Sequence, residues 1–204
     1  MRVVIGIVRV AVAAAVVVSV TATFLTARAP VNPLNFFGFF TIQSNIIAAA
    51  AELLAGIALL QRRRGPVLLR AAAITYIALT GLVYNTLLTG IAGGVALPWA
   101  NQVLHVWVPV VVLLDWTLVP DRPPLPWRQI WIVVPYPLVW LAVVLVRGAT
   151  DGWVPYPFLD PHIGYGTVAV YCTAITATVL LIAAIAWATS RLRLYRRRAP
   201  RTSD

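Results

Sequence analysis

The stretch Asn35-Phe-Phe-Gly-Phe-Phe-Thr41-Ile-Gln43-Ser44-Asn45 places four aromatic residues at the start of an apolar segment and follows them with four polar side chains. The apolar segment continues to about residue 61, which is long enough to cross a bilayer as a helix. Hydrocarbon offers no hydrogen-bond partner to a hydroxyl or an amide, so these side chains must face the protein interior. The stretch therefore predicts a transmembrane helix with a candidate functional site near its start.

The composition places the chain among integral membrane proteins. Of its 204 residues, 61% are hydrophobic and 11% are charged, and the mean hydropathy is +0.87. This leaves too little polar surface for a soluble globule. The 16 basic residues are all arginines, and they cluster in loops between apolar segments rather than on a basic face with interleaved aromatic residues. The net charge of +10 is therefore not attributed to nucleic-acid binding.

Apolar segments follow one another along the whole chain. We expect six transmembrane helices, at residues 3–27, 35–61, 66–91, 100–119, 127–146 and 162–190. Pro135 and Pro137 should kink the fifth by removing backbone donors. The first segment could instead be a signal peptide, but its apolar run is long for one, and we expect an uncleaved helix. The sequence predicts an all-α, polytopic membrane protein with a six-helix domain at 1–190 and a basic tail at 191–204, disordered from Ala199 onward.

The arginines also predict the orientation in the cell membrane. Fourteen of the 16 lie near segment ends on the side of the N-terminus, and only Arg28 and Arg147 lie on the other side. Because positively charged loops stay in the cytoplasm, both termini are expected there. Tryptophans commonly anchor helices at the membrane surface, and Trp116 and Trp187 are expected to do so on the inner side.

The predicted topology brings polar residues from three helices to one depth. The second and fourth helices begin on the outer side, so Thr41 and His105 lie roughly 9 Å and 8 Å below their outer ends. The third helix ends on that side, and a loop containing residues 152–162 covers it. We therefore expect a cavity in the outer leaflet. Its hydrogen-bonding candidates are Asn45, Asn85, Asn101 and Gln102, and its pocket candidates are Phe37, Phe40, Ser44, Tyr84, Tyr156 and Phe158.

The residue types in this set allow nucleophilic catalysis. A threonine hydroxyl reacts only with help from a neighbouring base, and neutral His105 could accept the proton of Thr41. One of the amide side chains could orient the imidazole or donate to a developing oxyanion. A simpler interpretation stays open, because a threonine in a helix often bonds the carbonyl four residues earlier and polar side chains often only hold helices together.

Two carboxylates are expected much deeper in the bundle. Glu52 and Asp115 should pair with a cation or stay protonated, and Arg9 and Arg70 are the candidate partners. We expect a structural role for both carboxylates, with a proton relay as the alternative.

No metal and no cofactor are predicted. The single cysteine, Cys172, excludes an internal disulfide and a cysteine metal cluster, and its apolar surroundings suggest a small packing residue. Haem held by two histidines would require His105 and His162 to face one iron, which makes it the weakest alternative.

Three short motifs resemble a known family of membrane proteins. They are Phe40-Thr41, the run Asn101-Gln-Val-Leu-His105-Val-Trp-Val-Pro109 with Asp115 six residues further on, and Trp153-Val-Pro-Tyr156-Pro157-Phe158-Leu159. Together they resemble the androgen-induced-gene-1 and androgen-dependent TFPI-regulating protein family. The chain is also similar to actinobacterial six-helix relatives of that family, for which the string Phe-Thr-Ile-Gln-Ser-Asn is characteristic. Shorter loops and the insertion of Pro155 into a Trp-Val-Tyr-Pro run depart from the animal pattern.

This resemblance implies a membrane threonine hydrolase that cleaves fatty acid esters of hydroxy fatty acids. The family's nucleophile and histidine fall on Thr41 and His105. We therefore expect a hydrolase of fatty acyl esters whose partners are membrane lipids. The alternative is a non-enzymatic membrane protein, either a lipid-binding scaffold or a small-solute permease. A polar path past Glu52 and Asp115 would favour the permease, and a blind, apolar pocket would favour the hydrolase.

Overall fold

The computed structural model describes residues 1–27, 31–90 and 97–192, and within these residues it contains helices and no strand. Six helical stretches of this part of the chain are long and apolar enough to cross a membrane. They are Arg2–Leu25, Phe40–Leu60, Val67–Leu88, Pro98–Leu118, Trp127–Thr150 and Tyr165–Thr189. The predicted all-α class and the six long apolar helices are thus confirmed. The disorder expected from Ala199 onward concerns residues outside the described ranges.

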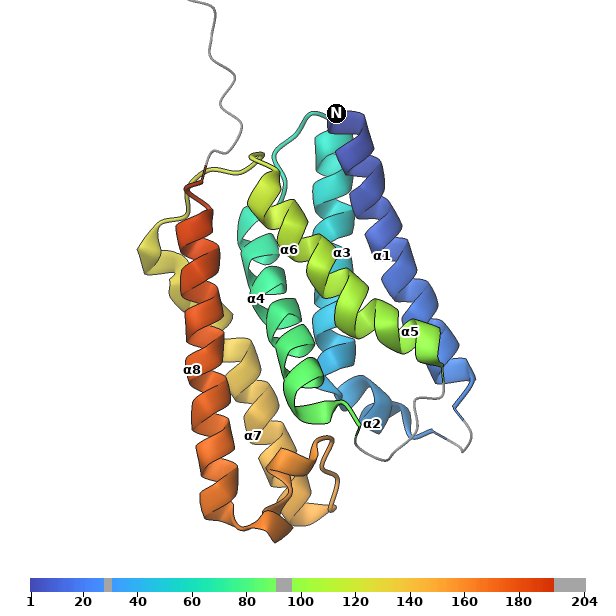
Figure 1. The fold of residues 1–204 in the computed structure, drawn as a ribbon, viewed down its shortest axis with the longest axis vertical. Coiled ribbons are helices and arrows are strands. Elements are labelled where there is room, and N and C mark those ends of the chain that lie inside the picture. The colour runs from blue at the N-terminus through green and yellow to red at the C-terminus, as the bar shows by residue number, and fades with distance from the viewer. Residues whose placement is uncertain (28–30, 91–96, 193–204) are drawn as a thin grey trace, which may run out of the picture.

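The long helices lie along one another and alternate in direction (Figure 1). α1 (Arg2–Leu25) packs along α3 (Phe40–Leu60), which packs in turn against α4 (Val67–Val83). α4 is central, because it also contacts α6 (Val108–Leu118) and α8 (Tyr165–Thr189). Ala48, Ala51 and Ala55 of α3 are at most 1% exposed, so neighbouring helices reach its backbone.

The helix expected at residues 35–61 is interrupted, which corrects the sequence-based prediction. α2 (Pro33–Gly38) is a separate short helix, and Phe39 has an extended backbone, with φ −64° and ψ 131°, before α3 begins. The indole nitrogen of Trp140 donates a hydrogen bond of 2.8 Å to the carbonyl oxygen of Gly38, which replaces the bond that a continuous helix would form there. Thr41 is consequently the second residue of a helix.

Two of the long helices contain π-helical turns. η1 (Tyr84–Leu88) continues α4, and η2 (Val103–Trp107) joins α5 (Pro98–Gln102) to α6. A π turn widens the helix locally and re-aims its side chains, and such turns are frequent at functional sites. η1 carries Tyr84 and η2 carries His105, both of which were singled out from the sequence.

The last two long helices begin differently from the prediction. η3 (Trp127–Val133) is a 3-10 helix, and α7 (Pro135–Thr150) starts at the first of the two prolines that were expected to cause a kink. The sixth helix was expected from His162, but the chain forms the short turns η4 (Pro157–Leu159) and η5 (Pro161–Ile163) before α8. The carboxylate of Asp160 accepts a hydrogen bond of 2.9 Å from the His162 backbone nitrogen, which favours the turn over an earlier helix start.

Two tryptophans expected at the membrane surface are buried instead. Trp116 is 1% exposed and Trp187 is 0% exposed. The indole nitrogen of Trp116 donates to the Ala186 carbonyl at 3.2 Å, and that of Trp187 donates to the Pro126 carbonyl at 3.0 Å. Both side chains therefore fasten α8 to α6 and to the segment before η3.

Candidate functional site

A mostly apolar cavity lies among the start of α3, α4, η1, η3, α7, α8 and the turn that contains η4. The space open to the centre of a water molecule is about 160 Å³, roughly ten times what one water needs. α8 packs on α4 and η3, and α7 packs on η3. α7 and α8 themselves make few contacts with each other, which leaves space between them. The hydroxyl groups in the cavity wall belong to Thr41, Thr80, Tyr156 and Thr176, and every other lining side chain is apolar, a tryptophan or Cys172.

Thr41 lies in this wall at the start of α3 and is 9% exposed. The phenol oxygen of Tyr156 accepts a hydrogen bond of 3.2 Å from the Thr41 backbone nitrogen and lies 3.3 Å from the Thr41 hydroxyl. The first backbone N–H groups of a helix have no partner within the helix, and Phe39 supplies no side-chain cap. Tyr156 therefore caps α3 from a distant part of the chain.

The hydroxyl of Thr41 differs from most helix hydroxyls of this chain. Thr75, Thr150 and Thr176 each donate to the carbonyl oxygen four residues earlier, at 2.8, 2.8 and 2.7 Å. The described hydrogen bonds of the Thr41 hydroxyl include only Tyr156. The simpler interpretation, a threonine satisfied by its own helix, does not fit this geometry, because the break after Gly38 removes the preceding helical turn.

A buried hydrogen-bond network fixes the backbone behind Thr41. The Ser44 hydroxyl donates to the Thr41 carbonyl at 3.1 Å and lies 2.7 Å from the Thr80 hydroxyl. The amide nitrogen of Asn45 donates to the same Thr41 carbonyl at 2.9 Å and to the Leu104 carbonyl at 3.1 Å. Ser44 and Asn45 are both 0% exposed. The network thus ties the start of α3 to α4 and to η2.

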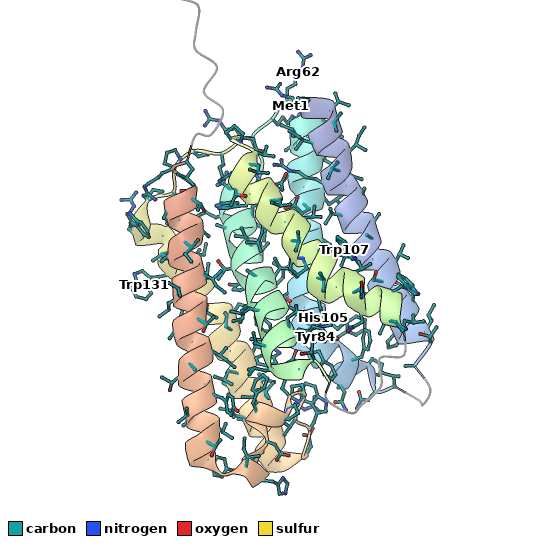
Figure 2. The ribbon with its side chains drawn as sticks, in the orientation of Figure 1. Met1, Arg62, Tyr84, His105, Trp107 and Trp131 are labelled. Atoms are coloured by element: carbon teal, nitrogen blue, oxygen red, sulfur yellow. The ribbon has the colours of Figure 1, made fainter. Side chains whose placement is uncertain are left out.

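His105 belongs to a second cluster, between η1 and η2. Its ring stacks on Tyr84 with 3.9 Å between ring centroids, and Figure 2 shows the two side chains side by side. The Nδ1 atom of His105 lies 3.0 Å from the Asn101 carbonyl oxygen, and Asn101 also donates to the Tyr84 hydroxyl. The amide of Asn85 donates to the His105 carbonyl at 3.3 Å. Four residues named from the sequence therefore meet here.

The structure does not join Thr41 and His105 directly. Both residues are fully described, and no hydrogen bond links their side chains. Thr41 lines the cavity, whereas His105 is absent from its wall. Asn45 connects the two clusters, because it bridges the carbonyls of Thr41 and Leu104, the residue before His105. The predicted dyad remains a prediction that needs movement of the imidazole.

The other pocket candidates divide into two groups. Phe40, Tyr156 and Phe158 line the cavity. Phe37 is 43% exposed and packs on neighbouring phenylalanines outside the cavity wall. Gln102, which was a hydrogen-bonding candidate, is exposed on α5. Sequence reasoning also missed Thr80 and the α8 side of the wall, because nothing distinguishes their residues from those of any apolar helix.

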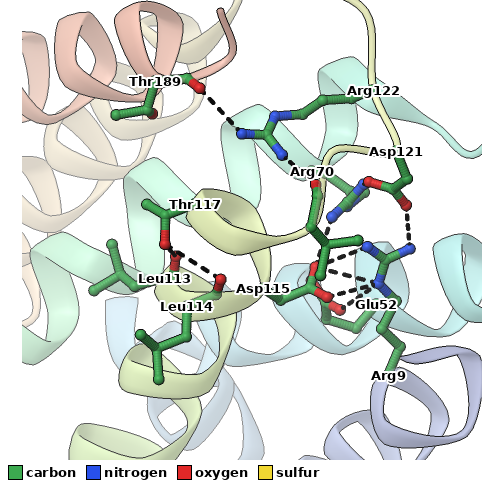
Figure 3. A network of polar contacts seen from close by, with 11 residues as sticks. Arg9, Glu52, Arg70, Leu113, Leu114, Asp115, Thr117, Asp121, Arg122 and Thr189 are labelled. Carbon is green, nitrogen blue, oxygen red and sulfur yellow. Dashed lines mark hydrogen bonds and ion pairs between the residues drawn. The ribbon is translucent and has the colours of Figure 1, made fainter. Parts of the chain in front are cut away.

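A network of buried ions lies at the end of the bundle that holds the N-terminus (Figure 3). Arg9 bonds Asp115 at 3.0 Å and Asp121 at 2.6 Å, and Arg70 bonds the same carboxylates at 2.6 and 2.9 Å. Glu52 lies 3.7 Å from Arg9. The pairing of Glu52 and Asp115 with arginines was predicted, but Asp121 was missed because the sequence places it in a loop.

Although Asp121 lies in a loop, its carboxylate is partly buried between Arg9 and Arg70, and this changes its pKa. Burial alone would raise its pKa, but the hydrogen bond from Arg9 and the positive charge of Arg70 outweigh burial and hold the pKa below its usual value. The neighbouring Arg122 lies over the Trp116 ring at 4.1 Å, and burial together with the charge of Arg70 lowers its pKa to about 10. None of these charged groups lines the cavity, and their contacts join α1, α3 and α4 to α6 and the residues that follow it.

The two histidines have different surroundings. His162 lies in the turn before α8, where its side chain is 94% exposed and its Nδ1 atom lies 2.7 Å from Asp160. His105 is instead packed on Tyr84 inside the bundle. Within residues 1–27, 31–90 and 97–192, no group of three or more histidine, cysteine, aspartate and glutamate side chains is placed to hold a metal ion.

No model of a known protein family matches the chain, and neither a curated protein nor a solved structure matches it. The likeness carried by the three sequence motifs therefore stays an expectation from those residues. The features of the molecule that bear on function are the apolar cavity and the few hydroxyl groups in its wall.

Proposed function

We propose that the chain is a multi-pass membrane protein that takes a fatty acyl chain into the cavity and hydrolyses its ester at Thr41. The observation that carries this proposal is the Thr41 hydroxyl, which stands in an apolar cavity wall without a bond to its own helix. An apolar space with a few convergent polar groups is typical of a site for an amphiphilic ligand. The three family-like motifs support the same conclusion.

Membrane insertion is supported by the six long apolar helices. Leucine, isoleucine and valine side chains are exposed along these helices, as expected where lipid is the solvent. We propose that both termini are cytoplasmic, because Arg62, Arg63 and Arg64 are exposed and Arg62 lies at the same end of the bundle as Met1 (Figure 2). In this orientation Thr41 and Tyr156 lie in the outer half of the bundle.

The proposed reaction proceeds through an acyl-enzyme. The Thr41 oxygen forms a bond to the ester carbonyl carbon, its proton passes to the imidazole of His105, and the carbonyl electron pair moves to oxygen. When the carbonyl re-forms, the bond to the alcohol breaks and the imidazolium returns the proton to the leaving oxygen. Water then repeats these steps on the acyl-threonine and releases the fatty acid.

His105 can serve as this base only if its ring moves to the Thr41 hydroxyl. The hydrogen bond from Nδ1 to the Asn101 carbonyl can persist in that role, because it leaves Nε2 free to accept a proton. This movement would accompany substrate binding, because catalytic hydrogen bonds often tighten only in the complex with substrate. The π turn that carries His105 is a local distortion of the helix and offers a place for such a shift.

A second candidate function is acyl-lipid binding without catalysis. The observation that favours it is the absence of a base in contact with the Thr41 hydroxyl among the described residues, since a neutral phenol is its partner. A permease receives no comparable support, because the cavity wall includes neither Glu52 nor Asp115.

The test is covalent labelling of the purified protein by a fluorophosphonate with a long alkyl chain. Wild type should be labelled, and Thr41→Ala should abolish labelling. Thr176→Ala is the matched control, because this threonine also lines the cavity but its hydroxyl bonds its own helix. His105→Ala should slow labelling by about 100-fold or more if the imidazole is the base. Binding of a fluorescent fatty acid by a wild type that is not labelled would favour the lipid-binding function.

A further inference from the structure

We propose that Tyr156 is a catalytic residue that donates its phenolic hydrogen to the ester oxygen as negative charge develops there. This inference rests on the proposed hydrolase and concerns a residue that neither the Thr41–His105 pair nor the amide side chains include. Its starting point is that Tyr156 contacts the reacting group itself, at 3.3 Å from the Thr41 hydroxyl oxygen.

The hydrogen bonds around the phenol leave its proton available. The Thr41 backbone nitrogen donates to the Tyr156 oxygen at 3.2 Å, so the phenol acts as an acceptor in that bond. Its own hydrogen can then point to the Thr41 hydroxyl or to a substrate oxygen beside it. When Thr41 attacks, the new oxyanion sits on the carbon bonded to the Thr41 oxygen, within reach of a donor already placed beside that oxygen.

The ring of Tyr156 is held by aromatic packing, which keeps the donor in place before the reaction. It stacks on Phe158 with 5.3 Å between centroids and an angle of 7° between planes. Phe39 and Trp140 pack around it, each with its ring centroid 5.9 Å away. A donor fixed in this way need not reorganise in the transition state, which is the source of its catalytic effect.

The protonation state also fits a donor. Burial raises the pKa of the Tyr156 phenol above its usual value, so the group stays protonated through the neutral range. It is therefore no base for Thr41, and the proton of Thr41 still has to go to an imidazole. The two roles are separate, with Tyr156 acting on the carbonyl oxygen and His105 on the hydroxyl.

The test compares Tyr156→Phe with Tyr76→Phe. Both variants remove one buried phenol oxygen that bonds the backbone, since Tyr76 donates to the Val133 carbonyl at 3.0 Å and lies outside the cavity wall. The quantities to measure are kcat and KM for a long-chain p-nitrophenyl ester in detergent, the melting temperature of each variant, and the rate of labelling by the alkyl fluorophosphonate.

Tyr156→Phe should lower kcat by about 100-fold with little change in KM, because the hydrogen bond forms mainly in the transition state. Tyr76→Phe should leave kcat within a few fold of wild type, at a similar loss of melting temperature. An active wild type whose kcat falls equally in both variants would overturn the role of Tyr156 and leave the hydrolase intact. A wild type with no turnover and no labelling would overturn both proposals.

Discussion

A Cβ atom on Gly38 would lie 2.6 Å from the Cη2 atom of Trp153, so the indole occupies the space that any other residue would need. Trp153 also contacts Arg147, whose guanidinium lies over the ring at 4.3 Å from the centroid. The loop after α7 thus packs against the last residue of α2. α3 begins two residues after this contact, where Thr41 lies in the cavity wall beside Tyr156.

Replacing Gly38 by alanine should therefore disturb the site as well as the fold. The added methyl group must displace Trp153, and overpacking of this kind destabilises by about 1 to 3 kcal/mol. We expect a lower melting temperature in detergent and a change in tryptophan fluorescence. Gly166→Ala is the matched control, because a Cβ there meets nothing within 4 Å, and alanine favours the helix. Equal melting temperatures for the two variants would contradict the role of the Gly38 contact.

The sequence predicted the parts of the fold that depend on composition and on the length of apolar segments. Six apolar segments became six long helices, because each is long enough to span hydrocarbon and is bounded by proline, glycine or arginine. The pairing of Asp115 with Arg9 and Arg70 was also predictable, since a buried carboxylate needs a cation.

The interruption at Gly38 and Phe39 was not predictable from the local sequence. Phe-Phe-Gly-Phe-Phe reads as part of one apolar helix, and the contacts that break it come from Trp140 and Trp153, about a hundred residues away. The capping of α3 by Tyr156 likewise depends on a residue that is distant in the sequence. The positions of Thr41 and His105 along their helices predict a similar depth in the membrane. They do not predict in which direction each side chain points.

Asp121 should contribute measurably to stability although it follows the end of α6. Asp121→Asn leaves Arg9 and Arg70 with one carboxylate fewer in a buried network, and removing one partner of such a network destabilises by about 3 kcal/mol. The measurement is thermal unfolding in detergent at neutral pH. Asp151→Asn is the control, because its pairing with Arg147 is largely exposed and should matter much less. A loss no larger than that of the control would show that the network does not fasten the bundle.

The contribution of Asp121 should also depend on pH in a definite direction. Its pKa is lower in the folded protein than in the unfolded chain, so the stabilisation is fully present above the unfolded value of about 3.9 and is lost as pH falls through the folded value. The difference in melting temperature between wild type and Asp121→Asn should therefore be constant from pH 7 to 5 and shrink below about pH 4. A difference that grew on acidification would contradict this assignment.

The proposed orientation can be tested with single cysteines in a Cys172→Ala background. His162→Cys places a thiol in the turn before α8, where the native side chain is 94% exposed, and Gln61→Cys places one after α3 at the opposite end of the bundle. In intact cells a membrane-impermeant maleimide should label the first and not the second, and both should be labelled after lysis. The reverse pattern would place the termini outside and the cavity toward the cytoplasm.

The length of the cavity should set the preference for acyl chains. Thr176 lines the cavity from α8, and Thr173, one turn earlier, is exposed and lies outside the wall. Thr176→Phe should fill the space for a long chain and lower turnover of a sixteen-carbon ester by about tenfold, since a few lost methylene contacts amount to about 1 to 3 kcal/mol.

A four-carbon ester provides the comparison, because it does not need the part of the cavity that the new ring fills. Its turnover should change little in Thr176→Phe, and Thr173→Phe should leave both esters near wild type. Equal losses for the short and the long ester in Thr176→Phe would mean that the substitution acts through the fold rather than through chain length. The acyl chain would then have to bind elsewhere, and Thr41 would lose the apolar cavity as the reason for its placement.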